Sequence, residues 1–287
     1  MEKLSNINTV KEILHKHGFT FSKALGQNFL INPSVCPRMA MECGVDENSG
    51  VIEVGPGIGV LTNELAKRAK KVIAVELDKR LLPVLEETLG EYENVKVINE
   101  DVMKLDLNKL IEEEFEGMNV CVCANLPYYI TSPIVMRLLE EKLNVSSITV
   151  MVQKEAAQRI CANVGTRQCG AVTAAVWYYS EPELLFNVSS GSFMPAPKVD
   201  SAVIRLNIRK EPPVSVKSEE VFFKTIKAAF SQRRKNIANS LSAGLSVGKQ
   251  EIISVLEDCG IPASKRAEEL TLENLGKIAD RLCDIII

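Results

Sequence analysis

The sequence predicts an α/β protein in which a doubly wound, Rossmann-like sheet precedes a small all-helical domain. Two observations favour this fold class. Short apolar runs rich in β-branched residues alternate with helical patterns through the first part of the 287 residues, as in parallel α/β sheets. After the proline-containing linker at residues 211–215, every periodic segment is helical. We therefore expect a first domain over residues 1–210 and a second over residues 211–287.

The first clear unit is a strand, a glycine loop, a helix and a second strand. An apolar strand at residues 51–54 leads into Gly55-Pro56-Gly57-Ile58-Gly59, and a helix over residues 60–69 and a strand over residues 72–75 follow. Glycines at this point let the backbone approach a ligand closely, and the helix N-terminus offers free N–H groups. Glu76 stands 21 positions after Gly55, the right distance to accept hydrogen bonds from ribose hydroxyls. The unit predicts a nucleoside-containing cofactor.

Polar residues at later strand ends bear on which cofactor this is. Asp101 follows an expected strand at residues 95–98, and a carboxylate there suits the exocyclic amine of adenine. Each acid alone is an ordinary helix cap, but acids gathered at one sheet edge would repel a pyrophosphate. S-adenosylmethionine has no phosphate and carries a sulfonium cation. The G-x-G-x-G spacing also differs from the G-x-G-x-x-G of dehydrogenases, so an NAD-dependent dehydrogenase is disfavoured.

The segment Asn125-Leu126-Pro127-Tyr128 opens a loop at the end of an expected strand over residues 119–124. Thr131 and the residues after it are typical of a helix start, and a helix over residues 132–141 and a strand over residues 147–152 continue the alternation. In open α/β sheets ligands bind at this edge. The asparagine amide oxygen and the Leu126 carbonyl are acceptors, and Tyr128 adds a flat ring. These groups suit a planar base with an exocyclic amine.

Two further loops have more than one interpretation. After an expected helix over residues 9–18, the segment at residues 23–30 is either a turn before the next helix or a pair of amides over a ligand. Residues 153–179 are expected to be helical. Phe193 lies between expected strands at residues 183–188 and 201–208, in a loop of glycine, serine and proline. This ring either fills the core or stacks on an unstacked base.

The charge distribution indicates a polyanionic partner. The net charge is −3, yet residues 205–249 carry ten Lys or Arg against three Glu. Three of these cations, Arg233, Arg234 and Lys235, fall on an expected helix over residues 221–241, where a solvated helix face is the alternative explanation. The two histidines would point to different faces of one helix, so we expect no metal site. Unpaired cysteines, and the lack of a membrane span or signal peptide, favour a cytoplasmic protein. We expect a monomer because no stretch looks like an obligate apolar interface.

At this point the sequence resembles the ribosomal RNA adenine-N6 dimethyltransferases. The motifs LGQNFL, EVGPGIGVLT, AVELD, NEDV, NLPYYITSPI, SFMPAPKVDSAV and FSQRRKNIANSL occur in the family's order and spacing, from about Lys23 to Leu241, and RAEEL follows near the C-terminus. The resemblance implies a class I methyltransferase fold, S-adenosylmethionine as methyl donor, and rRNA as partner. Within the family the likeness is greatest to the bacterial branch that dimethylates two adjacent adenines near the 3′ end of small-subunit rRNA during 30S maturation.

The resemblance also implies roles for individual residues. Gln27, Asn28 and Leu30 would close over the cofactor, Gly55 and Gly57 would pass under its methionine portion, Glu76 would hold its ribose, and Asp101 its adenine, with Asn125 at the junction of cofactor and target. Asn125, Leu126, Pro127 and Tyr128 would bind the target amine, and Phe193 would stack on the flipped base. Lys23, Lys198, Arg233, Arg234 and Lys235 would contact RNA, although the basic run before GQNFL is sparser than in many relatives.

Three other functions stay open at this level. A large-subunit rRNA methylase of the macrolide-resistance type would share the chemistry. A DNA adenine methylase often carries Asn or Asp-Pro-Pro-Tyr at the same place, but Leu126 and the C-terminal helices argue against it. A mainly non-catalytic ribosome-assembly factor would keep the fold without needing intact acceptors. Neither dimethylation nor the exact rRNA positions follow from the residues alone.

Overall fold

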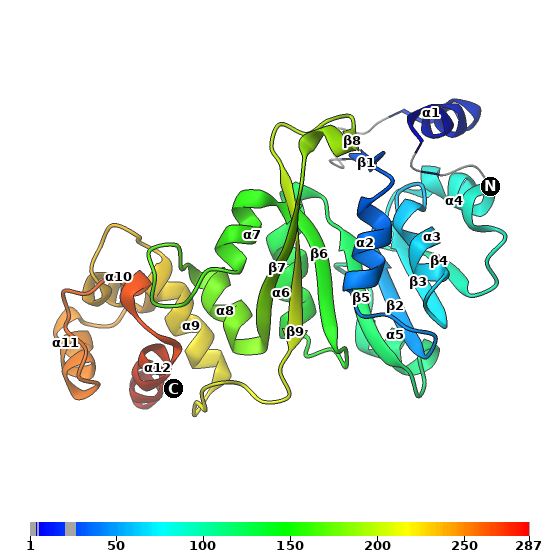
Figure 1. Ribbon diagram of the computed structural model, residues 1–287. Helices are drawn as coiled ribbons and strands as arrows, with labels where there is room; N and C mark the ends of the chain where they lie inside the picture. Colours follow the sequence, from blue (N-terminus) through cyan, green and yellow to red (C-terminus); the bar gives the residue numbers. More distant parts are fainter. Residues whose placement is uncertain (1–3, 5, 21–26, 287) are drawn as a thin grey trace. The chain divides into compact units, whose positions relative to one another are not determined.

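The computed structural model describes residue 4, residues 6–20 and residues 27–286 (Figure 1). Internal contacts divide the chain into two compact units. The first comprises Met1–Ala157 and Glu183–Ile208, and the second comprises Gln158–Pro182 and Arg209–Ile287. The candidate site lies entirely within the first unit, which is therefore described first.

A seven-stranded sheet with the order β4-β3-β2-β5-β6-β9-β7 organises the first unit. Neighbours from β4 to β6 are parallel, and β9 runs antiparallel to β6. The chain order reverses at β2, which lies between β3 and β5, so the switch point falls at the ends of these strands. The strands are β2 (Ser49–Val54), β3 (Lys71–Glu76), β4 (Val95–Asn99), β5 (Asn119–Asn125), β6 (Ser147–Gln153), β7 (Ser180–Val188) and β9 (Ser201–Ile208).

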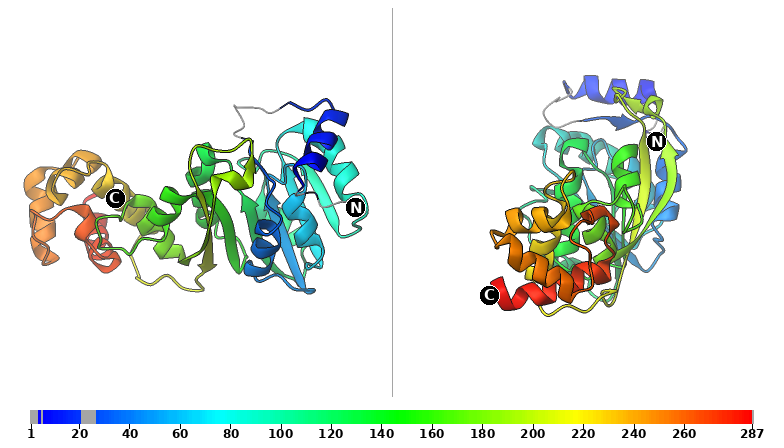
Figure 2. Two further views of the ribbon diagram at one scale, coloured as in Figure 1. Left: turned by 45° about the horizontal axis from the view of Figure 1, so that its top comes forward. Right: turned by 90° about the vertical axis from the view of Figure 1, so that its left-hand side faces the viewer.

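Helices lie on both faces of this sheet (Figures 1 and 2). Coverage on both faces explains why the central strands read as continuous apolar runs: every residue of β2 is buried. The doubly wound α/β fold is confirmed, and the expected strands are found within two or three residues of their predicted ends. The helices of this unit are α1 (Ile7–Lys16), α2 (Val35–Glu42), α3 (Val60–Ala66), the 3₁₀ helix η1 (Lys79–Leu81), α4 (Leu82–Leu89), α5 (Leu107–Glu114), the 3₁₀ helix η2 (Tyr128–Ile130), α6 (Thr131–Glu140) and α7 (Lys154–Ile160), whose end extends past residue 157.

A separate pair of two-residue strands joins distant parts of the sequence. β1 (Phe29–Leu30) pairs antiparallel with β8 (Phe193–Met194), with Leu30 opposite Phe193. The Ile31 N–H extends the pairing by donating to the Ser192 carbonyl at 2.9 Å. This ladder places the two motifs that the sequence left ambiguous, GQNFL and SFMP, side by side.

The second unit is helical and has its own core. It contains α8 (Ala171–Tyr179), α9 (Glu219–Phe230), α10 (Ile237–Leu245), α11 (Lys249–Asp258) and α12 (Leu272–Ile286). Tyr178 of α8 is buried in one apolar cluster with Phe222 of α9 and Leu275 of α12. Because of this packing, residues 158–182 group with the C-terminal helices, although the sequence analysis assigned them to the first domain. The boundary between residues 210 and 211 stays a prediction.

Two helix predictions are wrong in detail. Residues 153–179 form two helices, with residues 161–170 outside them. The single helix expected over residues 221–241 is also two, because α9 ends at Phe230 and α10 begins at Ile237. At the break the Asn236 side chain caps α10 by accepting from the Asn239 N–H at 3.0 Å.

No helix within the described part of the chain is long and apolar enough to cross a membrane.

Candidate cofactor and target-base site

The pocket lies at the carboxyl ends of the parallel strands of the first unit. Segments from β1, β2, β3, β5 and β8 and the loops that follow them contribute to its lining. The structure brings together all twelve residues that the sequence analysis named for cofactor and target base: Gln27, Asn28, Leu30, Gly55, Gly57, Glu76, Asp101, Asn125, Leu126, Pro127, Tyr128 and Phe193. All twelve residues line this one pocket, and the role of each within it stays a prediction.

The glycine loop after β2 needs its glycines. Gly55 and Gly57 have φ angles of 70° and 62°, in the left-handed region that side chains disfavour. A Cβ at Gly57 would also lie 3.1 Å from the Phe29 ring. The loop thus fits closely between β1 and the strand ends. At its glycines the backbone lines the pocket without a side chain.

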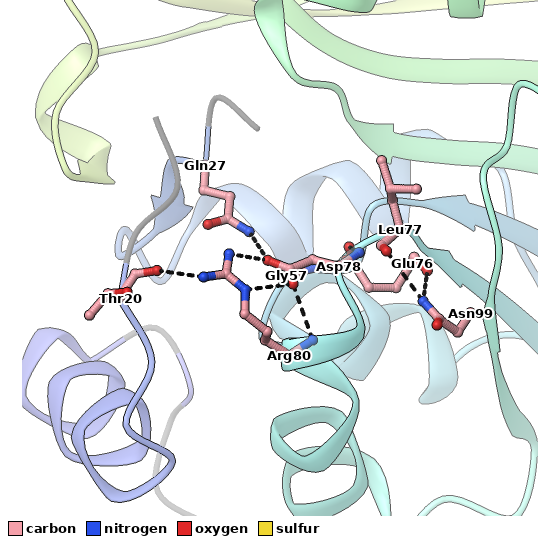
Figure 3. A network of polar contacts seen from close by, with 8 residues as sticks. All are labelled: Thr20, Gln27, Gly57, Glu76, Leu77, Asp78, Arg80 and Asn99. Atoms are coloured by element: carbon pink, nitrogen blue, oxygen red, sulfur yellow. Dashed lines mark hydrogen bonds and ion pairs between the residues drawn. The ribbon is translucent and has the colours of Figure 1, made fainter. Parts of the chain in front are cut away.

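Glu76 ends β3 as a buried carboxylate held by backbone donors. Its Oε1 accepts from the Asp78 N–H at 2.7 Å, and its Oε2 accepts from the Gly57 N–H at 3.3 Å. Burial raises the pKa of Glu76, which these N–H donors oppose. The Asn99 side chain of β4 donates to the Glu76 carbonyl at 2.7 Å, so the neighbouring strand end fixes the same residue (Figure 3).

Glu53 is a pocket residue that the sequence analysis missed. It is the last residue but one of β2, it is 1% exposed, and burial raises its pKa to about 8. Its Oε2 is buried and has no hydrogen-bond partner among the described residues. Glu53 could have been recognised from the sequence as a carboxylate inside an apolar strand, because buried strands otherwise avoid unpaired charge.

The loop after β5 builds the end of the pocket that is predicted to bind the target base. The Leu126 N–H donates to the Met151 carbonyl of β6 at 3.2 Å, so the strand pairing continues one residue past Asn125. The half-buried Tyr128 shares a 2.6 Å hydrogen bond between its hydroxyl and that of Ser201. Thr131 is the first residue of α6 and not its cap; its hydroxyl donates to the Pro127 carbonyl at 3.2 Å. These contacts fix the loop from both sides.

Phe193 combines the two roles that the sequence left open. Its side chain is 3% exposed and packs in a cluster with Leu30 and Val35, as a core residue would. It also lines the pocket, so one surface of the ring forms part of its wall. The pairing of β8 with β1 holds it there.

Four of the residues predicted to contact RNA lie at exposed positions outside the pocket. Lys198 is exposed in the loop between β8 and β9. Arg233, Arg234 and Lys235 are exposed in the turn between α9 and α10, and not on a helix as expected. Lys23 lies outside the described residues.

The charge of the pocket lining distinguishes between cofactor classes. The described lining residues include the carboxylates Glu53, Glu76, Glu100 and Asp101 and no lysine, arginine or histidine. A pyrophosphate would face these acids without a counter-charge. The ammonium and sulfonium groups of S-adenosylmethionine suit them, and the partnerless Glu53 oxygen fits a cationic ligand. Fold and site together define a class I methyltransferase that uses S-adenosylmethionine.

Comparison with known proteins identifies the family within this class to which the chain belongs. Residues 18–283 match the sequence model of the ribosomal RNA adenine dimethylase family, and the chain belongs to that family. It is 51% identical over 283 residues to the ribosomal RNA small subunit methyltransferase A of Alkaliphilus oremlandii, covering 98% of this chain and 99% of the relative. The protein of the same description from Bacillus licheniformis is 48% identical over 281 residues, covering 96% of each chain.

Solved structures agree with the assignment. The chain is similar to the 23S rRNA methyltransferase ErmE, with 28% identity and a TM-score of 0.67 over 89% of this chain and 100% of that one. It is also similar to a dimethyladenosine transferase from Plasmodium falciparum, with 25% identity and a TM-score of 0.75 over 89% and 98%. The protein is therefore an S-adenosylmethionine-dependent adenine dimethylase that acts on ribosomal RNA.

Proposed function

We propose that the protein dimethylates N6 of two adjacent adenines near the 3′ end of small-subunit rRNA, within the maturing 30S particle. The observation that carries the choice of subunit is the near full-length similarity, at about half identity, to relatives described as small-subunit methyltransferases. The 23S enzyme matches at only 28% identity. The intact pocket, with the Asn125 amide and the Leu126 carbonyl at its lining, supports catalysis over a purely structural role in assembly.

In this proposal Asn125 and Leu126 activate the target amine. The adenine amine is a weak nucleophile because its lone pair is delocalised into the ring. When the Asn125 side-chain oxygen and the Leu126 carbonyl accept hydrogen bonds from its two N–H groups, the nitrogen becomes more tetrahedral and its lone pair is less delocalised into the ring. Fixed acceptors at a strand end need no reorganisation during the reaction. The product proton leaves to water, so no strong base is required.

Tyr128 and Phe193 hold the flipped base in this position. Extruding a base from its stack costs a few kcal/mol, which aromatic contacts at the pocket offset. The Tyr128–Ser201 hydrogen bond and the β1–β8 ladder fix the two rings before the base enters.

The other end of the pocket would hold S-adenosylmethionine, which supplies an electrophilic methyl group when bound. Glu76 would accept hydrogen bonds from its ribose and Asp101 from its adenine, and the loop of Gly55 and Gly57 would lie beside its methionine portion. Gln27, Asn28 and Leu30 would cover it. Glu53, with an oxygen that has no partner among the described residues, would accept from the ammonium group.

Exposed cations would grip the RNA backbone. Arg233, Arg234 and Lys235 of the second unit and Lys198 of the first, with Lys23, contact phosphates and supply affinity without reading sequence. We place the protein in the cytoplasm as a monomer that works on the 30S particle.

The test compares two substrates. Small subunits lacking the modification, and separately large-subunit rRNA, are incubated with the protein and methyl-labelled S-adenosylmethionine and digested to nucleosides. We expect labelled dimethyladenosine from the small subunit alone. Label only in large-subunit rRNA would overturn the proposed target, and an active Asn125→Ala variant would overturn the proposed activation of the amine.

A further inference from the structure

We propose that Asp78 and Arg80 are positioning residues for the cofactor, which fasten Gln27 to the strand end that carries Glu76. Neither residue lines the pocket. The inference rests on the cofactor-binding roles proposed above for Glu76 and Gln27. It adds the residues that hold these two groups in place, which we call the Asp78 cluster: Asp78, Arg80 and Gln27 (Figure 3).

Asp78 is a carboxylate whose two oxygens are both used. The residue is 7% exposed and is the N-cap of the 3₁₀ helix η1. Its Oδ1 accepts from the Arg80 N–H at 3.1 Å and from Arg80 Nε at 2.8 Å. Its Oδ2 accepts from Arg80 Nη2 at 2.6 Å and from Gln27 Nε2 at 2.9 Å. Capping η1 would require only the first of these four bonds, so the others call for a second role.

The same residue is bonded to Glu76 through its backbone. The Asp78 N–H donates to Glu76 Oε1 at 2.7 Å, while the other oxygen of Glu76 is held by Gly57. Asp78 thus connects two pocket residues. Its side chain binds the Gln27 amide, and its backbone N–H binds the Glu76 carboxylate. A displacement of Asp78 moves both pocket residues.

Arg80 holds the N-terminal segment at a second point. Its guanidinium carbon lies 5.0 Å from the centre of the Phe19 ring, and its Nη1 donates to the Thr20 carbonyl at 3.5 Å. The Phe19 ring is 6.0 Å from that of Phe29, whose edge borders the glycine loop at Gly57. Arg80 therefore supports the wall formed by β1 as well as the Gln27 amide.

The planar fork of arginine is essential to this arrangement. Arg80 places Nε and Nη2 on the two oxygens of one carboxylate and keeps its face for an aromatic ring, which a lysine ammonium cannot do. Lys79 supplies the matched control. It precedes Arg80 in η1, is exposed, and makes no ion pair found in the described part of the chain.

The experiment measures binding of S-adenosylmethionine by calorimetry in the full-length protein, without RNA. We expect Arg80→Met to raise the Kd about fivefold or more and Lys79→Met to leave it unchanged, although both remove one positive charge from η1. Arg80→Lys should fall between Arg80→Met and the parent. Gln27→Ala should weaken binding as well, and its combination with Arg80→Met should cost less than the product of the single effects because both act through Asp78.

Two further readouts separate positioning from general stability. With Arg80→Met the KM for S-adenosylmethionine should rise while kcat at saturating cofactor and the Kd for RNA stay unchanged. A Kd for the cofactor equal to that of Lys79→Met would overturn the inference, as would a loss of RNA binding in parallel. Failure of the proposed cofactor role of Glu76 is recognised separately, because Glu76→Ala would then bind S-adenosylmethionine normally.

Discussion

The pocket of the first unit and the basic turn of the second differ in the sign of their charged groups and in how these groups are held. In the pocket the charged groups are carboxylates, and one of them, Glu76, is buried at a strand end and held by backbone N–H groups. In the turn between α9 and α10 the charged groups are cations, exposed and attached to short loop backbone. Buried, fixed charge selects one small ligand by geometry. Exposed, adaptable charge suits a large polyanion whose sequence need not be read.

The largest effect should come from the target-base end of the pocket. Asn125→Ala removes the proposed acceptor for the adenine amine, and loss of such a preorganised group costs about 10²–10³-fold in kcat. Single-turnover methylation of small subunits measures it. RNA affinity should hardly change, and a variant that binds RNA poorly would contradict the division of labour between the two regions.

Removing the buried carboxylate of Glu53 should have the next largest effect, on cofactor affinity. Glu53→Gln should weaken S-adenosylmethionine binding about tenfold to a hundredfold, since hydrogen bonds to charged groups are worth about 1.5–3 kcal/mol. A bound cation favours the ionised carboxylate, and the pKa of Glu53 without ligand is raised to about 8. Binding in the parent should therefore release a proton at pH 7 and strengthen as pH rises toward 8. In Glu53→Gln both effects should vanish.

The same residue should shape stability in the absence of ligand. The pKa of Glu53 is about 8 when folded, against an ordinary value of 4.5. Between these values the unfolded chain has lost a proton that the folded protein keeps, so the free energy of unfolding falls as pH rises through that window. Denaturant titrations from pH 5 to 8 should show a shallower decline for Glu53→Gln.

Neutralising the basic turn should give a moderate effect confined to RNA. The triple variant Arg233→Gln/Arg234→Gln/Lys235→Gln should lower RNA affinity about tenfold and flatten its dependence on salt, since fewer counterions are released. Cofactor affinity should not move. Lys11→Gln/Lys104→Gln/Lys109→Gln is the matched control in the first unit, and equal losses in both variants would mean that only net charge matters.

The smallest effect should follow from Tyr128→Phe. This change keeps the ring and removes the hydroxyl bonded to Ser201. A lost hydrogen bond of this kind is worth about 0.5–1.5 kcal/mol, so kcat/KM should fall about threefold to tenfold. Tyr128→Ala, which also removes the stacking surface, should fall much further; equal losses would show that the hydroxyl and not the ring is what matters.

The parts that sequence predicted well are those specified by neighbouring residues. The strand at Ser49–Val54 and the glycine loop after it follow from an apolar run and from glycines that adopt positive φ. The break between α9 and α10 was missed because Arg233, Arg234 and Lys235 are good helix formers, and the cap at Asn236 that begins α10 was not recognised. The β1–β8 ladder was missed because two-residue strands carry no periodicity. Glu53 was overlooked because the apolar pattern around it dominates.

The β1–β8 ladder also bears on the order in which the protein becomes competent. It pairs Leu30 with Phe193, so one wall of the pocket is a contact between residues far apart in the chain. Such a contact forms only after the intervening chain has been made and its ends have met, with the loop-closure entropy that this entails. The strands that carry Glu53, Glu76 and Asn125 precede residue 126. During synthesis the strands that carry the charged residues are therefore complete well before Phe193 is made, and the wall that Phe193 forms with Leu30 is the last part of the pocket to assemble.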